Sequence, residues 1–231
     1  MALSTKDVKT GEAGGGLKTI IPGQHKLKIN SIELKRFSFM EQDQGYYFIM
    51  NVETEPIDGF EGFMIDVNDP SKGNYAGKVG QVKANKFFYK NGTTKGGIEI
   101  NRDTELMKQI KKICLATDQA EWFENADGKY DTIEAMVDGF NTDAPFKDVL
   151  LNMTVAGKEY QKANGHIGYD MFLPKLSKGL VAMEAADAKL SKIMPFNEAD
   201  HWSKYVAEPV AEFGDAGETT PDLSGAPDFE L

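Results

Sequence analysis

The stretch that decides the fold is "GQHKLKINSIELKRF", residues 23–37. Apolar and polar side chains alternate along it, as on a strand with one buried face, with apolar positions at Leu27, Ile29, Ile32 and Leu34. The second pair of these positions is out of phase with the first. Because a change of phase within one strand requires an extra residue, we expect a bulge or sharp bend at residues 30–31. A long strand bent in this way is typical of a strand that coils around a barrel.

Four more segments are expected to be strands. Residues 45–56, "GYYFIMNVETEP", are rich in aromatic and β-branched residues and stop at a proline, and residues 60–67, "FEGFMIDV", alternate again. Strands return near the C-terminal end at residues 148–160 and 165–174, separated by the polar connection "QKAN".

The long segment between the third and fourth expected strands, about residues 68–146, holds helices. Apolar side chains recur at helical spacing in "DTELMKQIKKICLA", which Asp103 or Thr104 can cap. A shorter helix, "TIEAMVDGF", follows a start signal at Thr132 and should end near Gly139. One more helix is expected at residues 180–193.

This order of elements predicts a β-rich α+β fold: a five-stranded Greek-key barrel of the oligonucleotide-binding (OB) type, with a helical insertion between strands 3 and 4. We expect one domain at residues 20–205. A flexible, glycine-rich arm (1–19) would precede it and a disordered acidic tail (206–231) would follow it.

Composition excludes several classes of protein. The single cysteine, Cys114, leaves no internal disulfide and no cysteine-based zinc site, and with only three histidines we expect no metal and no cofactor. The N-terminal residues do not resemble a signal peptide, and no segment is long and apolar enough to span a bilayer. We therefore expect a cytoplasmic protein without a membrane partner.

The net charge of −10 is unevenly distributed. Residues 72–112 carry 10 basic and 3 acidic groups, whereas residues 205–231 carry 7 acidic groups and no basic one. Within the basic region, residues 77–97 interleave cations and rings, namely Lys78, Lys83, Lys86, Phe87, Phe88, Tyr89, Lys90 and Lys95. Cations that follow phosphates and rings on which bases stack are what single-stranded nucleic acid requires. The alternative interpretation is an ordinary strand with Phe88 facing the core and solubilising lysines.

Other candidate contacts lie on the expected strands. The first strand ends in Lys35 and Arg36, the second carries Tyr47, and the last hairpin carries Lys158, Tyr160 and Lys162. No nucleophile elbow, zinc-protease motif or complete phosphate loop occurs in the sequence, so catalysis has no candidate residue and we expect a protein that is not an enzyme.

The sequence ends in "DLSGAPDFEL", residues 222–231, in which Asp222, Asp228, Phe229, Glu230 and Leu231 combine acidic and apolar side chains. Two interpretations stay open: a solubilising tail, or a peptide that docks onto another protein. The bulky apolar residues favour docking, because a purely solvating tail has no use for them.

The chain resembles bacteriophage single-stranded DNA-binding proteins in residues 22–35, residues 157–169 and the acidic tip with Pro227, Asp228 and Phe229. In this sequence Leu231 follows the Phe-Glu pair, where such tips close with phenylalanine. The resemblance implies that the tip recruits replication or recombination proteins, such as a polymerase, a helicase or a primase.

The expected function is therefore binding and protection of single-stranded DNA, with little sequence preference, during replication, recombination and repair. A homo-oligomer is possible. The alternative is a phage structural or assembly protein that uses a β-rich domain and has no role with nucleic acid.

Overall fold

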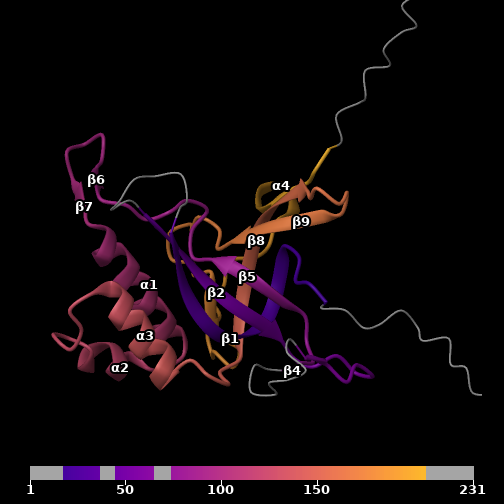
Figure 1. Ribbon diagram of the computed structural model, residues 1–231, viewed down its shortest axis with the longest axis horizontal. Coiled ribbons are helices and arrows are strands. Elements are labelled where there is room, and N and C mark those ends of the chain that lie inside the picture. The colour runs from indigo at the N-terminus through magenta and orange to yellow at the C-terminus, as the bar shows by residue number, and fades with distance from the viewer. Residues whose placement is uncertain (1–17, 37–44, 65–73, 207–231) are drawn as a thin grey trace, which may run out of the picture.

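The computed structural model describes residues 18–36, 45–64 and 74–206 (Figure 1). Its strands are β1 (Gly23–Arg36), β2 (Tyr46–Thr54), β3 (Phe63–Met64), β4 (Asn74–Tyr75), β5 (Val79–Lys83), β6 (Gly92–Thr93), β7 (Glu99–Ile100), β8 (Leu151–Gln161), β9 (Ile167–Phe172), β10 (Met183–Ala185) and β11 (Trp202–Ser203). Its helices are α1 (Arg102–Ala116), α2 (Ala120–Asn125), α3 (Ile133–Asp143) and α4 (Glu198–His201). The fold is β-rich, as the sequence predicts.

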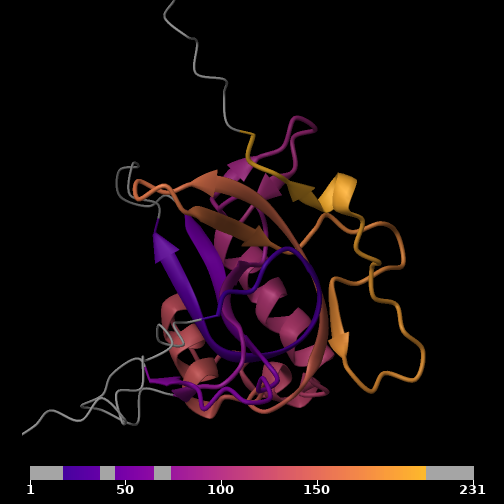
Figure 2. The ribbon, with the colours of Figure 1, turned by 90° about the vertical axis from the view of Figure 1, so that its right-hand side faces the viewer.

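The main sheet is mixed and has 7 strands. β1 pairs with β2, β2 with β5 and β8 with β9, all antiparallel, whereas β5 and β9 are parallel. β1 also pairs with β8, and β10 and β11 extend the sheet from β8. The sheet is strongly curved (Figure 2).

β1 divides its length between two partners. Its first part, Gly23–Leu27, pairs with β8, and the part from Leu27 onward pairs with β2. The pairing with β2 shifts register between Ile29 and Ser31, which confirms the predicted bulge. Leu27, Ile29 and Ile32 are therefore all buried in the core despite the change of phase in the sequence.

Helices α1, α2 and α3 gather on one side of the sheet (Figure 1). The Asn101 side chain caps α1 by accepting a hydrogen bond from the Thr104 amide, and Thr132 caps α3 by accepting one from the Ala135 amide. The cap of α1 thus lies before the predicted Asp103 or Thr104. α3 continues past Gly139, where the Tyr130 ring packs so closely that a Cβ would lie 2.3 Å from its hydroxyl oxygen.

One side chain joins the helices to the sheet. Asn141 of α3 accepts a hydrogen bond from the Ile32 amide at 2.8 Å and donates one to the Ile32 carbonyl at 2.7 Å. β1 does not pair with β8 beyond Leu27. Along this edge of β1 the side-chain amide of Asn141 takes the place of a neighbouring strand. Two backbone groups near the core are satisfied in this way.

The prediction of a third main strand at residues 60–67 is wrong. Of the described residues in 60–67, only Phe63–Met64 form a strand, and this strand pairs with β4 in a separate sheet. Positive φ angles at Gly59 and Gly62 interrupt the extended chain there. β5 takes the third position, so the insertion between the third and fourth main strands begins after Lys83.

The prediction of a helix at residues 180–193 is also wrong. β10 occupies part of this segment, and Val181 forms a bridge with Ile193. The Glu184 carboxylate accepts hydrogen bonds from the Ser191 hydroxyl and the Lys192 amide. These tertiary contacts outweigh the helix propensity of an alanine-rich sequence.

Ile20, near which the sequence predicts that the domain begins, is fully buried, and Thr19 forms a bridge with Val79. Nearly all of the expected arm and tail lies outside the described residues. Among the helices of the described ranges, none combines the length and apolar character needed to cross a membrane.

Replacing Asn141 with leucine should lower the free energy of unfolding by about 1–3 kcal/mol, because it leaves the Ile32 amide and carbonyl without their partner. Chemical denaturation measures this change. Thr142→Ala, one residue away and exposed, is the control and should stay within about 0.5 kcal/mol of the wild type. Equal stability of the two variants would contradict a joining role for Asn141.

Candidate nucleic-acid interface

A depression of about 420 Å³ lies across the main sheet. Five strands contribute to its lining, which consists of Lys35, Arg36, Tyr47, Ile49, Gln81, Lys83, Tyr160, Tyr169, Asp170 and Met171. We call it the sheet-face depression. It brings together predicted contacts that lie far apart in the sequence, namely Lys35, Arg36, Tyr47, Lys83 and Tyr160.

Strand register explains why these side chains meet. Lys35 of β1 lies opposite Tyr47 of β2, and Ile49 of β2 lies opposite Lys83 of β5. Because alternate residues of a strand point to opposite faces, Tyr47 and Ile49 share one face while Phe48 is buried on the other. One face of the sheet therefore fills the core and the other forms the depression.

Lys83 lies at the centre of this arrangement. Its ammonium is 2.7 Å from the Asp170 carboxylate on β9 and 4.2 Å from the centroid of the Tyr47 ring. The ring and the carboxylate hold the cation between them, and its side chain is 20% exposed. Lys35 adds a second cation, so the depression has two cations against one carboxylate; Arg36 also lines it, but its guanidinium bonds the Tyr46 hydroxyl on the side of the helices.

The Tyr160 ring forms the wall on the β8 side and is 45% exposed. Gly168 of β9 pairs with it in register, and a Cβ at this glycine would lie 2.7 Å from the Tyr160 ring and 2.7 Å from Cε of Lys162. Both side chains thus lie over the glycine. Lys158 is exposed on the same face of β8, since it alternates with Glu159.

Amide side chains extend this face from Gln81, in the lining of the depression, toward β1. Gln81 of β5 donates a hydrogen bond to Asn51 of β2 at 3.0 Å, and Asn51 donates one to Ser31 of β1 at 2.9 Å. These residues form a polar ladder across three strands. Such groups can also hydrogen bond to sugars, phosphates and bases.

A network of hydrogen bonds joins Arg36 to Tyr46 and Glu134. Arg36 donates a hydrogen bond to the Tyr46 hydroxyl at 3.1 Å, and this hydroxyl donates to the Glu134 carboxylate of α3. The hydrogen bond from Tyr46 lowers the pKa of Glu134, and the guanidinium of Arg102 acts in the same direction. Desolvation and the same carboxylate raise the pKa of Tyr46. The network ties the end of β1 to the helices.

The fold places the side chains of residues 77–97, the lysine-aromatic segment, in different environments. Phe87 is 66% exposed, whereas Tyr89 packs against the core, where burial raises its pKa. Phe88 is half-buried, with its ring edge-on to Tyr47 at 6.1 Å between centroids. Lys86, Phe87 and Tyr89 line a second, larger concavity near α1, described below. Tyr89 consequently offers less ring surface for stacking than the sequence suggests.

The remaining predicted cations line neither concavity. Lys78 is exposed just before β5, and Lys90 and Lys95 are exposed before and within the β6–β7 hairpin, which projects from the molecule (Figure 1). The tail residues Asp222, Asp228, Phe229, Glu230 and Leu231 lie outside the described residues.

Sequence reasoning missed Gln81, Tyr169 and Asp170. Tyr169 and Asp170 were within the expected last strand, but only the pairing of β9 with β5 brings Asp170 beside Lys83 and this part of β9 to the depression. Gln81 could have been found if β5 had been recognised, because it alternates with buried Val82.

In the described part of the chain, no group of three or more histidine, cysteine, aspartate or glutamate residues could hold a metal ion. The one cysteine, Cys114, is buried, and burial raises its pKa to about 11. This thiol is therefore poorly suited to act as a nucleophile.

Searches against protein-family models, curated proteins and solved structures found no match to this chain.

Replacing Glu134 with glutamine should reduce the loss of stability in acid. The pKa of Glu134 is lowered in the folded state, so its carboxylate stabilises the protein above its unfolded-state pKa of 4.5, and this contribution is lost as the pH falls through the folded-state pKa. Melting temperatures measured from neutral pH to about pH 3 should therefore fall less in the variant than in the wild type.

The control for this measurement is Glu121→Gln, which changes an exposed carboxylate on α2. It should follow the wild-type pH profile. A Glu134→Gln profile that also coincides with the wild type would show that the Tyr46–Glu134 hydrogen bond does not stabilise the fold.

Proposed function

We propose that this protein binds single-stranded DNA, with little sequence preference, through the sheet-face depression, and that it is a binding protein rather than an enzyme. The observation that carries the proposal is the convergence of Lys35, Arg36, Lys83, Tyr47 and Tyr160 from four strands into one concave surface. Cations beside accessible rings are the combination that single strands require.

We further propose that the main sheet is a barrel of the OB type. The proposal is supported by the succession of pairings β1–β2–β5–β9–β8, after which β8 pairs with β1. It is also supported by the position of α1–α3 between β5 and β8 in the chain. In OB folds the face of strands 2 and 3 binds oligonucleotides, and their counterparts here are β2 and β5, which carry Tyr47 and Lys83.

In this mechanism the backbone and the bases meet different side chains. Lys35 and Lys162 lie at the edge of the surface and would neutralise phosphates, while Tyr160 presents an exposed ring to a base. Arg36 is held by the Tyr46 hydroxyl at the end of β1. Lys83 has a carboxylate partner, so its main role is to orient Tyr47 beneath the strand. None of these contacts reads a particular base, which accounts for the low sequence preference.

The same proposal assigns the tail a recruiting role. Its acidic and apolar residues, ending in Phe229 and Leu231, suit docking onto a replication or recombination protein such as a polymerase, helicase or primase. The resemblance to phage single-stranded DNA-binding proteins supports this assignment, and with it a role in replication, recombination and repair of DNA in the cytoplasm of a host cell.

Fluorescence anisotropy of a labelled oligo-dT of about 30 nucleotides tests the proposal. Affinity should fall as salt rises, with a slope of about 0.7 in log affinity per phosphate contacted, and unlabelled duplex should compete poorly. Lys35→Ala should lower this slope by about 0.7, whereas Lys189→Ala, an exposed lysine elsewhere, should leave it unchanged. Absence of binding at low salt would refute the proposed function.

Replacing Tyr160 with alanine should weaken oligo-dT binding by about 1–3 kcal/mol, because one stacked base loses its ring. Tyr205→Ala is a matched control: Tyr205 is 38% exposed, against 45% for Tyr160, and it hydrogen bonds to Gln161, which points to the opposite face of β8. The same anisotropy titration measures both variants. Equal affinity of the two would exclude stacking on Tyr160.

A further inference from the structure

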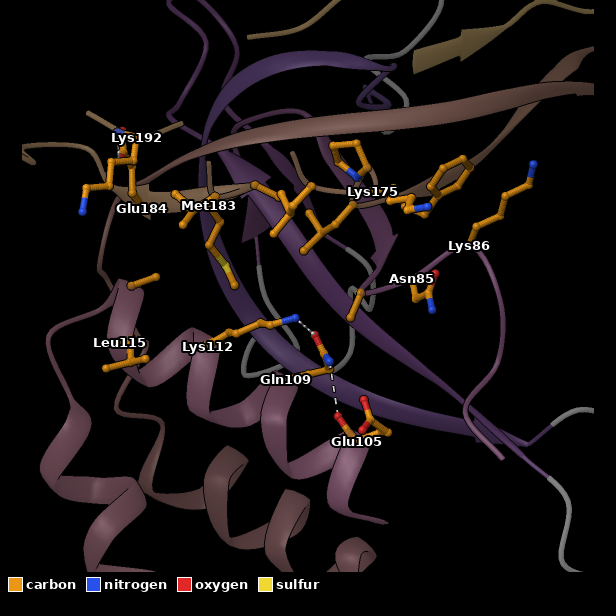
Figure 3. A pocket seen from close by; sticks show the side chains of 18 of the residues that line it. Asn85, Lys86, Glu105, Gln109, Lys112, Leu115, Lys175, Met183, Glu184 and Lys192 are labelled. Atoms are coloured by element: carbon orange, nitrogen blue, oxygen red, sulfur yellow. Dashed lines mark hydrogen bonds between the residues drawn. The ribbon is translucent and has the colours of Figure 1, made fainter. Parts of the chain in front are cut away.

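A second concavity, of about 930 Å³, lies between α1 and the segments that follow β5 and β9 (Figure 3). We call it the helix-side groove. It is separate from the sheet-face depression, although the two meet along the chain: Lys83 lines the depression and Ala84 the groove, Met171 the depression and Phe172 the groove.

Large apolar side chains line the groove from several segments, namely Phe87, Leu115, Phe172, Leu176, Val181 and Met183. Three of them remain open to solvent: Phe87 is 66% exposed, Leu115 60% and Leu176 40%. Exposed leucines and phenylalanines that come together from three separate segments form a patch of the kind that marks a binding surface.

Cations surround this apolar surface. Lys86 and Lys192 lie toward opposite ends of the groove, while Lys112 projects from α1 toward the strands (Figure 3). The Lys112 ammonium donates a hydrogen bond to the neutral Gln109 side chain at 3.1 Å, and desolvation lowers its pKa. A carboxylate that approaches from the open side would find this ammonium beside the apolar surface.

Three carboxylates also line the groove, and two of them are already engaged. Glu105 binds Lys108 at 2.6 Å, and Glu184 accepts hydrogen bonds from Ser191 and the Lys192 amide. Asp118 is the third. Four lysines line the groove as well, namely Lys86, Lys112, Lys175 and Lys192. The lining therefore has a net charge of +1 when all three carboxylates are counted, and a larger positive charge when the two engaged ones are left out.

The chemistry of the lining favours a peptide over a nucleic acid. Phe87 supplies an exposed ring, but the other two open side chains, Leu115 and Leu176, are aliphatic; they accept bulky apolar side chains and provide no flat ring for a base. Tyr89, the other ring from the lysine-aromatic segment, packs against the core. Phosphates would also pass close to Glu105, Asp118 and Glu184.

From this combination we infer that the helix-side groove docks an acidic peptide segment of another protein, one that carries bulky apolar side chains. The apolar side chains enter between α1 and β10, and the carboxylates meet Lys112 and the lysines at the rim. This interaction is separate from the proposed contact with DNA and from the role assigned to the tail.

The experiment selects peptides from a displayed random library on the immobilised full-length protein and measures the affinity of those enriched. Leu115→Glu introduces repulsion at an exposed position, and Lys112→Ala removes the central cation. Leu190→Glu and Lys111→Ala are the matched controls, because Leu190 is 82% exposed outside the groove and Lys111 is exposed beside Lys112 on α1. Circular dichroism confirms that all four variants are folded.

The inference predicts that the enriched peptides combine Asp or Glu with Phe, Leu or Trp. Leu115→Glu and Lys112→Ala should each lower the affinity for these peptides by roughly tenfold or more, while the control variants should bind them as the wild type does. Excess oligo-dT should not displace them.

Enriched peptides that lack this composition, or that bind all variants equally, would overturn the assignment. Displacement by oligo-dT would assign the groove to nucleic acid instead. A dimer in sedimentation equilibrium that Leu115→Glu dissociates would assign it to a second copy of this chain.

Discussion

The arrangement of the sheet depends on one constraint: β1 must pair with β8 along its first part and with β2 along the rest. An unbroken period of two would point either Leu27 and Ile29 or Ile32 away from the core. The register shift between Ile29 and Ser31 removes this conflict, so all three are buried while the strand turns from one partner to the other. Asn141 then satisfies the Ile32 amide and carbonyl on the edge that β8 no longer covers.

The same alternation that fills the core creates the candidate interface. Phe48, Met50 and Val82 are buried on one face of β2 and β5, and this commits Tyr47, Asn51, Gln81 and Lys83 to the other. Lys83 shows how the face is kept in order, since Asp170 and the Tyr47 ring fix its ammonium. Lys35 at the edge of this face is exposed.

Beyond the ends of β5 and β9 the character of the surface changes. Residues up to Lys83 and Met171 belong to a polar, ring-lined depression, and those after them to a groove between the sheet and α1 that is rich in aliphatic side chains. A segment that reads as one lysine-aromatic unit in the sequence therefore contributes to two surfaces. The two proposals therefore assign DNA to one surface and a protein partner to the other.

The sequence by itself determined the features that depend on local periodicity: the bent first strand, the last hairpin and the two helices of the insertion. It also identified Lys35, Arg36, Tyr47 and Tyr160 as candidates, because their chemistry is visible without a structure. Only the tertiary structure decided that β5 rather than residues 60–67 completes the sheet, that residues 180–193 are not helical, and which rings remain exposed. β5 is short and contains Gly80, so its local signal is weak, and its place depends on parallel pairing with β9, more than 80 residues later in the sequence. Contacts between such distant segments leave no periodic pattern in either one, and for this reason they could not be predicted from the sequence.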